Sequence, residues 1–257
     1  MCRHLAWIGR PRTLASLILE PPHSLLRQSY APREQRHGRV NADGFGVGWY
    51  APDVRREPAR YRRDQPIWTD ASFASLAGVV ASGVVLAAVR SATPPFPSDE
   101  AGAAPFTAGR WLFSHNGVVD DFARAAVELR ARLPAAAAAG VETPTDAALL
   151  WAMLRHRLES GQALPEALSA VVSDAVAVSG GRLNLLATDG QTVAATTYGD
   201  TLFTHRNADG VIVASEPFDD EPGWERVPDR CLVVVSSARL DVFPLPAHLT
   251  TPAEGRT

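Results

Sequence analysis

Short apolar runs rich in β-branched residues gather toward the two ends of this sequence, and strong helical patterns lie mainly between them. Residues 84–89 form one such run in the first half, and residues 183–188 and 231–236 form two in the second. The strongest helical pattern covers residues 145–158, with apolar side chains on one side. Strands, then helices, then strands again, without regular β-α alternation, predict an α+β fold with layered antiparallel sheets.

Length, charge and cysteine usage narrow the class of protein. The chain has 257 residues, enough for one large domain or two small ones with a sizeable core. Its net charge of −3 gives no reason to expect nucleic acid or an anionic membrane as partner. The two cysteines, Cys2 and Cys231, lie at opposite ends, which argues against a disulfide framework and favours a reducing cytoplasm. Residues 1–12 lack the apolar core of a secretory signal, and residues 76–89 are too short to span a bilayer, so we expect a soluble cytoplasmic protein.

The first residues place a cysteine directly after the initiator methionine. Cysteine is small enough for an aminopeptidase to remove Met1, and Cys2 would then carry both a thiol and a free α-amine. With ordinary pKa values of about 8.5 for a thiol and about 7.7–8.0 for an α-amine, these groups form a nucleophile and its base. Residues 4–8 are apolar enough for a buried strand, which would hold this terminus inside the protein. The alternative is an ordinary N-terminus that happens to carry a cysteine.

Three further sites carry polar residues at the ends of predicted elements. Arg90 follows the first buried strand, where an arginine also suits a structural ion pair. Asn116-Gly117 is expected to stop a strand over residues 111–115, and by itself it is a good turn. Asp146 opens the long helix, and by itself it would be a helix cap.

Two segments between these sites carry weaker signals. Residues 41–50 alternate glycine with apolar residues, which suits a strand that another backbone or a ligand approaches closely. A dinucleotide-binding fingerprint is rejected there, because it requires glycine where Trp49 stands. Residues 59–64 are the expected hairpin partner, and the arginines in and before them are most simply a solvated sheet edge. Residues 92–109 are rich in proline, glycine and alanine and predict a long loop of a kind that is often functional.

The order of these motifs resembles the class II glutamine amidotransferases, which have an N-terminal cysteine nucleophile and belong to the N-terminal nucleophile (Ntn) hydrolases. The matching motifs are Cys2, residues 41–46, Arg90-Ser91-Ala92-Thr93, His115-Asn116-Gly117 and Thr145-Asp146. The resemblance implies an α+β fold of the Ntn-hydrolase type, a four-layer αββα sandwich of two antiparallel sheets flanked by helices. We expect a single such domain over residues 2–245 and a flexible tail over residues 246–257.

The resemblance also implies how the first motifs hydrolyse a γ-glutamyl amide. Cys2 would attack the γ-carbonyl and form a γ-glutamyl thioester, with its own α-amine as the base. The side-chain amide of Asn116 and the N–H of Gly117 would stabilise the oxyanion. No proton transfer is assigned to His115 or His4, which are expected to be packed or hydrogen-bonded strand residues.

Substrate binding is implied for the remaining motifs. Arg90, helped by Thr93, would hold the α-carboxylate of the substrate, and Asp146 would hold its α-ammonium group. No cofactor is implied, and the histidines show no spacing typical of metal ligands.

Several longer strings are most similar to family members that act in ergothioneine biosynthesis: residues 1–9, 20–30, 41–50 and 214–220. Those members stand alone and remove glutamate from γ-glutamyl-hercynylcysteine sulfoxide. The implied partner is therefore a small γ-glutamyl substrate whose far end carries a trimethylammonium group, and no particular oligomeric state is implied. Candidates to contact that cation are Tyr30, Trp68, Phe218, Asp219 and Trp224.

Two other functions stay open. A chain of this length leaves no room for a fused synthase domain, but it could pass ammonia to a separate synthase as a glutaminase subunit. A non-catalytic binding protein with the same fold would retain Met1, because the α-amine of Cys2 would then be blocked as an amide.

Overall fold

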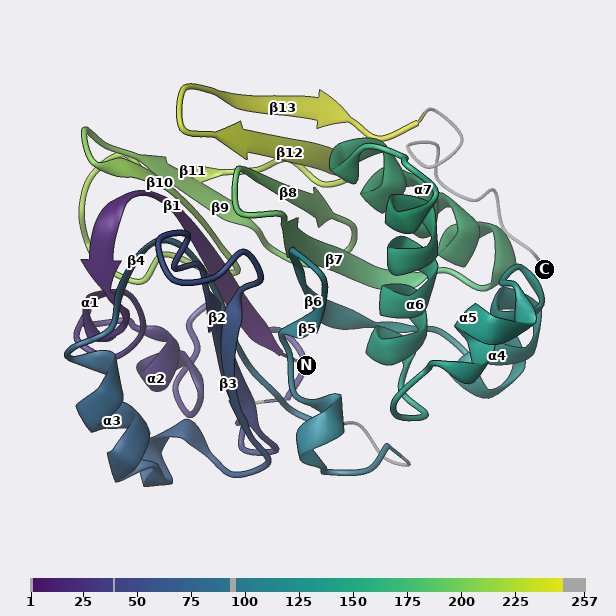
Figure 1. Cartoon of the computed structure of the whole chain (residues 1–257), viewed down its shortest axis with the longest axis horizontal. Coiled ribbons are helices and arrows are strands. Elements are labelled where there is room, and N and C mark those ends of the chain that lie inside the picture. Colours follow the sequence, from purple (N-terminus) through teal and green to yellow (C-terminus); the bar gives the residue numbers. More distant parts are fainter. Residues whose placement is uncertain (1, 39, 93–95, 247–257) are drawn as a thin grey trace.

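The computed structural model describes residues 2–38, 40–92 and 96–246. Within them, the strands form two antiparallel sheets that pack face to face (Figure 1). Helices cover the outer face of each sheet. The result is the four-layer αββα sandwich that the sequence predicted.

The first sheet has seven strands in the order β11-β9-β10-β1-β4-β2-β3. Their bounds are β1 Arg3–Thr13, β2 Phe45–Trp49, β3 Ala59–Arg63, β4 Ala81–Val89, β9 Phe203–Arg206, β10 Gly210–Ala214 and β11 Glu225–Arg226. The outer face is covered by α1 Leu14–Ile18, α2 Leu25–Gln28 and α3 Ala71–Ala77, with a short 3₁₀ turn η1 at Ile67–Thr69. Strand β1 lies at the centre, paired with β4 on one side and β10 on the other.

The second sheet has six strands in the order β13-β12-β8-β7-β6-β5. Their bounds are β5 Phe106–Ala108, β6 Trp111–Val119, β7 Gly181–Thr188, β8 Thr192–Thr197, β12 Cys231–Ser236 and β13 Leu240–Pro244. The helices on this side are α4 Phe122–Ala131, α5 Ala135–Ala139, α6 Asp146–Glu159 and α7 Leu164–Val178. A 3₁₀ turn, η2 at Glu100–Gly102, precedes β5.

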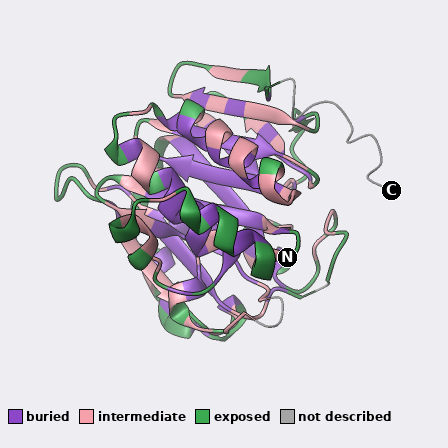
Figure 2. Cartoon of the chain, turned by 90° about the vertical axis from the view of Figure 1, so that its right-hand side faces the viewer, coloured by how far each residue is buried: buried purple, intermediate pink, exposed green. Residues whose placement is uncertain are grey.

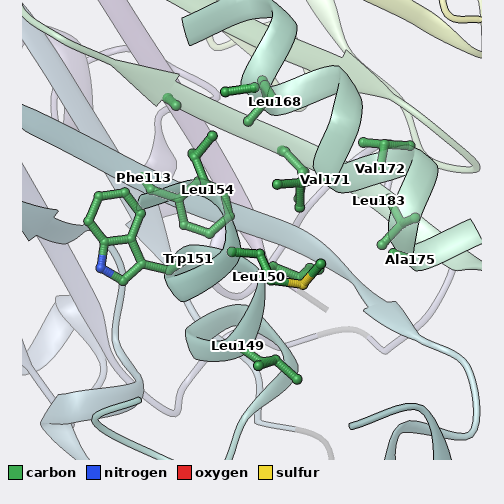
Figure 3. Packing of buried hydrophobic residues seen from close by; sticks show 14 of the residues in the cluster. Phe113, Leu149, Leu150, Trp151, Leu154, Leu168, Val171, Val172, Ala175 and Leu183 are labelled. Carbon is green, nitrogen blue, oxygen red and sulfur yellow. The ribbon is translucent and has the colours of Figure 1, made fainter. Parts of the chain in front are cut away.

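The apolar core has three layers because each sheet is buried on both faces. Along β1, Leu5 and Trp7 face the helices, whereas Ala6 and Ile8 face the other sheet, as the alternation of side chains along a strand requires. Figure 3 shows the outer layer of the second sheet, where Phe113 of β6 packs with residues of α6 and α7. Figure 2 shows the buried residues concentrated in the sheets and the exposed ones on the outer helix faces.

One predicted strand boundary was wrong. Strand β6 does not stop at residue 115 but continues to Val119, because Asn116 and Gly117 pair with Asn184 and Leu183 of β7. The backbone of β7 approaches so closely that a Cβ on Gly117 would lie 1.8 Å from the carbonyl oxygen of Arg182. Asn116-Gly117 is therefore a paired strand segment and not a turn.

The prediction of a solvated arginine edge on β3 needs correction as well. Nη1 of Arg60 donates to the carbonyl oxygen of Pro105, and Nη1 of Arg62 donates to the carbonyl oxygens of Ala101 and Ala103. Burial lowers the pKa of both guanidinium groups. These two arginines hold the segment that precedes β5 against the edge of the first sheet.

Residues 247–257 of the predicted tail lie outside the described residues. Across the ranges that the structure describes, no helix is both long and apolar enough to cross a membrane.

Candidate active site

Cys2 lies directly before the central strand of the first sheet and lines a pocket with an empty volume of about 550 Å³. Arg90 directly follows β4, β6 contributes His115 and Gly117, and the first turn of α6 contributes Asp146. Sequence motifs separated by up to 144 positions thus meet at one pocket. A concave site lined by apolar side chains and a few charged ones is typical of a small-molecule site.

Arg90 brings an uncompensated positive charge to this pocket. Its side chain is only 7% exposed, and its guanidinium donates to the carbonyl oxygens of Pro97 at 2.7 Å and Asp99 at 3.4 Å. Among the described residues, no carboxylate forms an ion pair with Arg90. The alternative role as a structural ion pair therefore finds no partner there, and the guanidinium is available to an anionic ligand.

The position of Arg90 depends on a close glycine. A Cβ on Gly102, in η2, would lie 2.7 Å from the guanidinium carbon of Arg90. The Asp99 side chain accepts a hydrogen bond from the N–H of Gly102 at 2.8 Å and so fixes this turn. The carbonyl oxygens of Pro97 and Asp99 thus bind the guanidinium of Arg90, and the missing side chain at Gly102 leaves room for it.

Asp146 brings the opposite charge. Its carboxylate accepts hydrogen bonds from the N–H of Val119 at 3.0 Å and from the N–H of Ala147 at 2.7 Å, and the residue is 7% exposed. The neighbouring Thr145 acts as the N-cap of α6, because its hydroxyl accepts from the N–H of Ala148. Asp146 is therefore not the side-chain cap, and its remaining lone pairs can accept from a cationic ligand.

The two predicted oxyanion donors lie side by side on β6 but differ in exposure. Gly117 lines the pocket, whereas the side chain of Asn116 is fully buried and donates from Nδ2 to Oγ of Ser215 at 3.2 Å. Oδ1 of Asn116 has no hydrogen-bond partner within the described residues. Thr93, the predicted helper of Arg90, lies outside the described residues.

Among the pocket residues to which the sequence assigned no function, three have contacts that shape the site. His115 is buried and donates from Nε2 to the carbonyl oxygen of Arg182 at 3.0 Å, while its Nδ1 lies 4.0 Å from Asp146. Phe96 lines the pocket and packs edge-on against Phe122 at the start of α4. Gly102 supports Arg90. His115 belonged to a predicted motif, but its proximity to Asp146 was not predicted. Strand β6 continues past His115 to Val119, whose N–H binds the Asp146 carboxylate.

The strand that follows Cys2 carries two buried basic residues. Burial lowers the pKa of Arg3, although the nearby carboxylates of Glu216 and Asp200 oppose that shift. Burial also lowers the pKa of His4 to about 3, with Arg3 and His115 adding to the effect. His4 therefore stays neutral at ordinary pH, and its Nδ1 shares a hydrogen bond with the Ser114 hydroxyl.

The aromatic candidates for a cation site fall into two groups, neither of which lines the pocket at Cys2. Phe218 is a core residue that packs against Trp224, and Trp224 donates from Nε1 to Asp219 at 2.8 Å. Tyr30 and Trp68 form an edge-on pair that is about two-fifths exposed. Ordinary packing explains the first group, whereas the second is open to solvent. Among the described residues, no group of three or more His, Cys, Asp or Glu side chains could hold a metal ion.

Comparisons with known proteins identify the family. The model described as "Glutamine amidotransferases class-II" matches residues 22–209. The chain is 48% identical over 246 residues to a protein of Mycolicibacterium smegmatis named gamma-glutamyl-hercynylcysteine sulfoxide hydrolase, a match that covers 95% of this chain and 100% of that protein. This chain belongs to the class II glutamine amidotransferase family. Because the family is enzymatic, the prediction of an enzyme is confirmed.

Solved structures agree on the fold. A glutamine aminotransferase class-II domain protein from Silicibacter pomeroyi superposes with a TM-score of 0.67 at 23% identity, covering 95% of this chain and 99% of that one. The phosphoribosylpyrophosphate amidotransferase of Bacillus subtilis gives a TM-score of 0.66 at 13% identity, covering 97% of this chain and 50% of that one. At these identities the likeness shows the fold alone, which is the Ntn-type sandwich.

Proposed function

We propose that this enzyme hydrolyses a γ-glutamyl amide with Cys2 as nucleophile, and that its substrate is γ-glutamyl-hercynylcysteine sulfoxide. The carrying observation is the pair of opposite charges at the pocket: Arg90 is buried without a carboxylate partner among the described residues, and Asp146 is nearly buried with lone pairs to spare. An amino-acid head group carries an α-carboxylate and an α-ammonium, so it satisfies both charges at once. A simple amide would leave both unpaired.

The position of Cys2 at the pocket supports the following reaction. After removal of Met1, the α-amine of Cys2 takes the thiol proton while the sulfur attacks the γ-carbonyl carbon. The C–N bond then breaks, the leaving amine takes that proton, and a γ-glutamyl thioester forms. Water then attacks the thioester, and the α-amine of Cys2 accepts a proton from that water. Glutamate leaves, and the proton returns to the sulfur to restore the thiol.

The oxyanion formed in both steps needs fixed donors. The N–H of Gly117 and the Nδ2 of Asn116 belong to adjacent residues of β6, which is paired with β7 at this point. A donor on such a strand does not need to reorganise as charge develops, and a lost donor typically costs about 10²–10³ in rate.

The choice of substrate rests on the relatives. Proteins named gamma-glutamyl-hercynylcysteine sulfoxide hydrolase are 48% identical in Mycolicibacterium smegmatis and 47% identical in Mycobacterium tuberculosis. With this substrate the products are glutamate and hercynylcysteine sulfoxide. A reducing compartment such as the cytoplasm suits the two free cysteines, one of which is the nucleophile.

The test compares kcat/KM for γ-glutamyl-hercynylcysteine sulfoxide and for glutamine. The mature protein should have an intact mass without Met1 and should prefer the sulfoxide. Cys2→Ala should lower turnover by at least about a thousandfold. Cys231→Ala is the matched control, because burial raises the pKa of the Cys231 thiol and that residue does not line the pocket.

Other outcomes would point to the other functions. A preference for glutamine, with turnover stimulated by a separate synthase, would identify an ammonia-delivering subunit instead. A protein that keeps Met1 and turns over neither compound would contradict the N-terminal nucleophile mechanism.

A further inference from the structure

Ser215 lies at a junction between the two sheets, next to the strand that carries Cys2. It directly follows β10 and is fully buried. Its N–H donates to the carbonyl oxygen of His4 at 2.9 Å, which continues the pairing of β10 with β1 toward Cys2. Its carbonyl oxygen accepts from the hydroxyl of Thr201 at 2.8 Å. The backbone of Ser215 is thus fixed on both sides.

The hydroxyl of Ser215 reaches across to the second sheet. Oγ accepts a hydrogen bond from the N–H of His4 at 3.0 Å and another from Nδ2 of Asn116 at 3.2 Å. One oxygen atom therefore joins the strand that starts at the nucleophile to the asparagine of the proposed oxyanion site. Sequence reasoning gave Ser215 no role, because 99 positions separate it from Asn116.

The amide of Asn116 has no other anchor in the described part of the chain. Its Oδ1 is buried without a hydrogen-bond partner, and the bond to Ser215 uses one of the two Nδ2 hydrogens. The terminal torsion of an asparagine side chain is broad, so packing alone defines the plane of the amide poorly. A single hydrogen bond to a fixed oxygen defines that plane and leaves the second Nδ2 hydrogen for a ligand.

We propose that Ser215 is a positioning residue for this reaction: its hydroxyl fixes the plane of the Asn116 amide and ties it to the strand of Cys2. The inference rests on the proposed function and deepens it. Ser215 does not touch the substrate but acts through Asn116. Its contribution should therefore appear in kcat, where oxyanion stabilisation is expressed, and not in KM.

The first test is Ser215→Ala, assayed with γ-glutamyl-hercynylcysteine sulfoxide. Misplacement of a catalytic group by about 1 Å can cost about 10²-fold, so we expect kcat to fall by about 10- to 100-fold while KM changes less than about threefold. Ser82→Ala is the matched control, because Ser82 is likewise a buried serine whose hydroxyl accepts two hydrogen bonds, in its case from the N–H groups of Tyr50 and Val84. Ser82 lies far from Cys2, since it pairs with Arg12 at the opposite end of β1. The control should lose comparable stability and keep kcat.

A double-mutant cycle separates positioning from a general structural role. If Ser215 acts through Asn116, then Ser215→Ala should cost less than about twofold in kcat when Asn116→Ala is already present. Full additivity of the two losses would overturn the proposal, as would an unchanged kcat in Ser215→Ala alone. A kcat loss in Ser82→Ala as large as that in Ser215→Ala would also overturn it.

A second pair of variants keeps the test decisive if Ser215→Ala folds poorly. Ser215→Thr and Ser215→Val have nearly the same shape, and only the first retains a hydroxyl, so any crowding is common to both. We expect the threonine variant to exceed the valine variant at least tenfold in kcat, and equal values would refute the proposal. An inactive wild-type enzyme would instead refute the proposed function, and the inference with it.

Discussion

His4 makes the stability of this fold sensitive to mild acid. Its imidazole is fully buried, Nε2 has no hydrogen-bond partner within the described residues, and burial lowers its pKa to about 3. In the unfolded chain the pKa is about 6.5, so between these values the unfolded state binds a proton that the folded state does not. The free energy of unfolding therefore falls as pH is lowered, by about 1.4 kcal/mol per pH unit below pH 6.5 and down to the folded-state pKa.

The assay is urea unfolding of the wild type and of His4→Gln at several pH values between about 7.5 and 4.5. Carboxylates titrate in both proteins, so the difference between the two free energies of unfolding isolates His4. When the pH is lowered from 7.5 to 4.5, the free energy of unfolding of the wild type should fall by about 3 kcal/mol more than that of His4→Gln. Ser114→Ala is the control: it removes the hydrogen bond to Nδ1 but keeps the imidazole, so it should keep the wild-type slope. A difference between wild type and His4→Gln that does not vary with pH would refute the reasoning.

Three substitutions test the pocket itself. Arg90→Met should raise KM for the γ-glutamyl substrate by about 10- to 100-fold with a smaller change in kcat, because a charge-assisted hydrogen bond is lost. An unchanged kcat/KM would show that the substrate carboxylate binds elsewhere. Gly102→Ala adds a Cβ 2.7 Å from the guanidinium carbon of Arg90 and should also raise KM. Gly78→Ala is the control, because its Cβ would meet nothing closer than 3.6 Å, and it should leave KM unchanged. Equal KM values in the two variants would contradict this role of Gly102. Gly117→Ala places a Cβ 1.8 Å from the carbonyl oxygen of Arg182 and should lower the free energy of unfolding by about 3 kcal/mol or more, as measured by urea unfolding. A free energy of unfolding equal to that of the wild type would show that the two strands separate easily there.

Local pattern predicted most of the elements and the residues at their ends. The continuous apolar runs of β1 and β4 and the apolar stripe of α6 are properties of short windows of sequence. Arg90 and Asp146 were found because they stand directly after a strand and at a helix start, and such positions gather at one edge of a layered fold. The resemblance to a family then supplied roles that spacing alone does not give.

The errors arose where a distant partner decides the structure. Asn116-Gly117 has strong turn propensity, but β7 runs alongside the same residues and pairs with them through Asn184 and Leu183, so the strand continues. The arginines of β3 look like an edge exposed to water, yet backbone carbonyls some forty positions away accept hydrogen bonds from two of them. Ser215 was missed for the same reason, since nothing near it in the sequence indicates Asn116.

The central position of β1 has a consequence for synthesis of the enzyme. Strand β1 is made first, but one neighbour, β4, lies about eighty residues later, and the other, β10, lies more than two hundred residues later. Until residue 214 has left the ribosome, one edge of β1 and the anchor of Asn116 are both missing. Cys2, the proposed nucleophile, is thus synthesised long before the strands that complete its surroundings. We therefore expect a chain that ends before residue 214 to lack hydrolase activity, because Cys2 would be present without the strand that completes its surroundings.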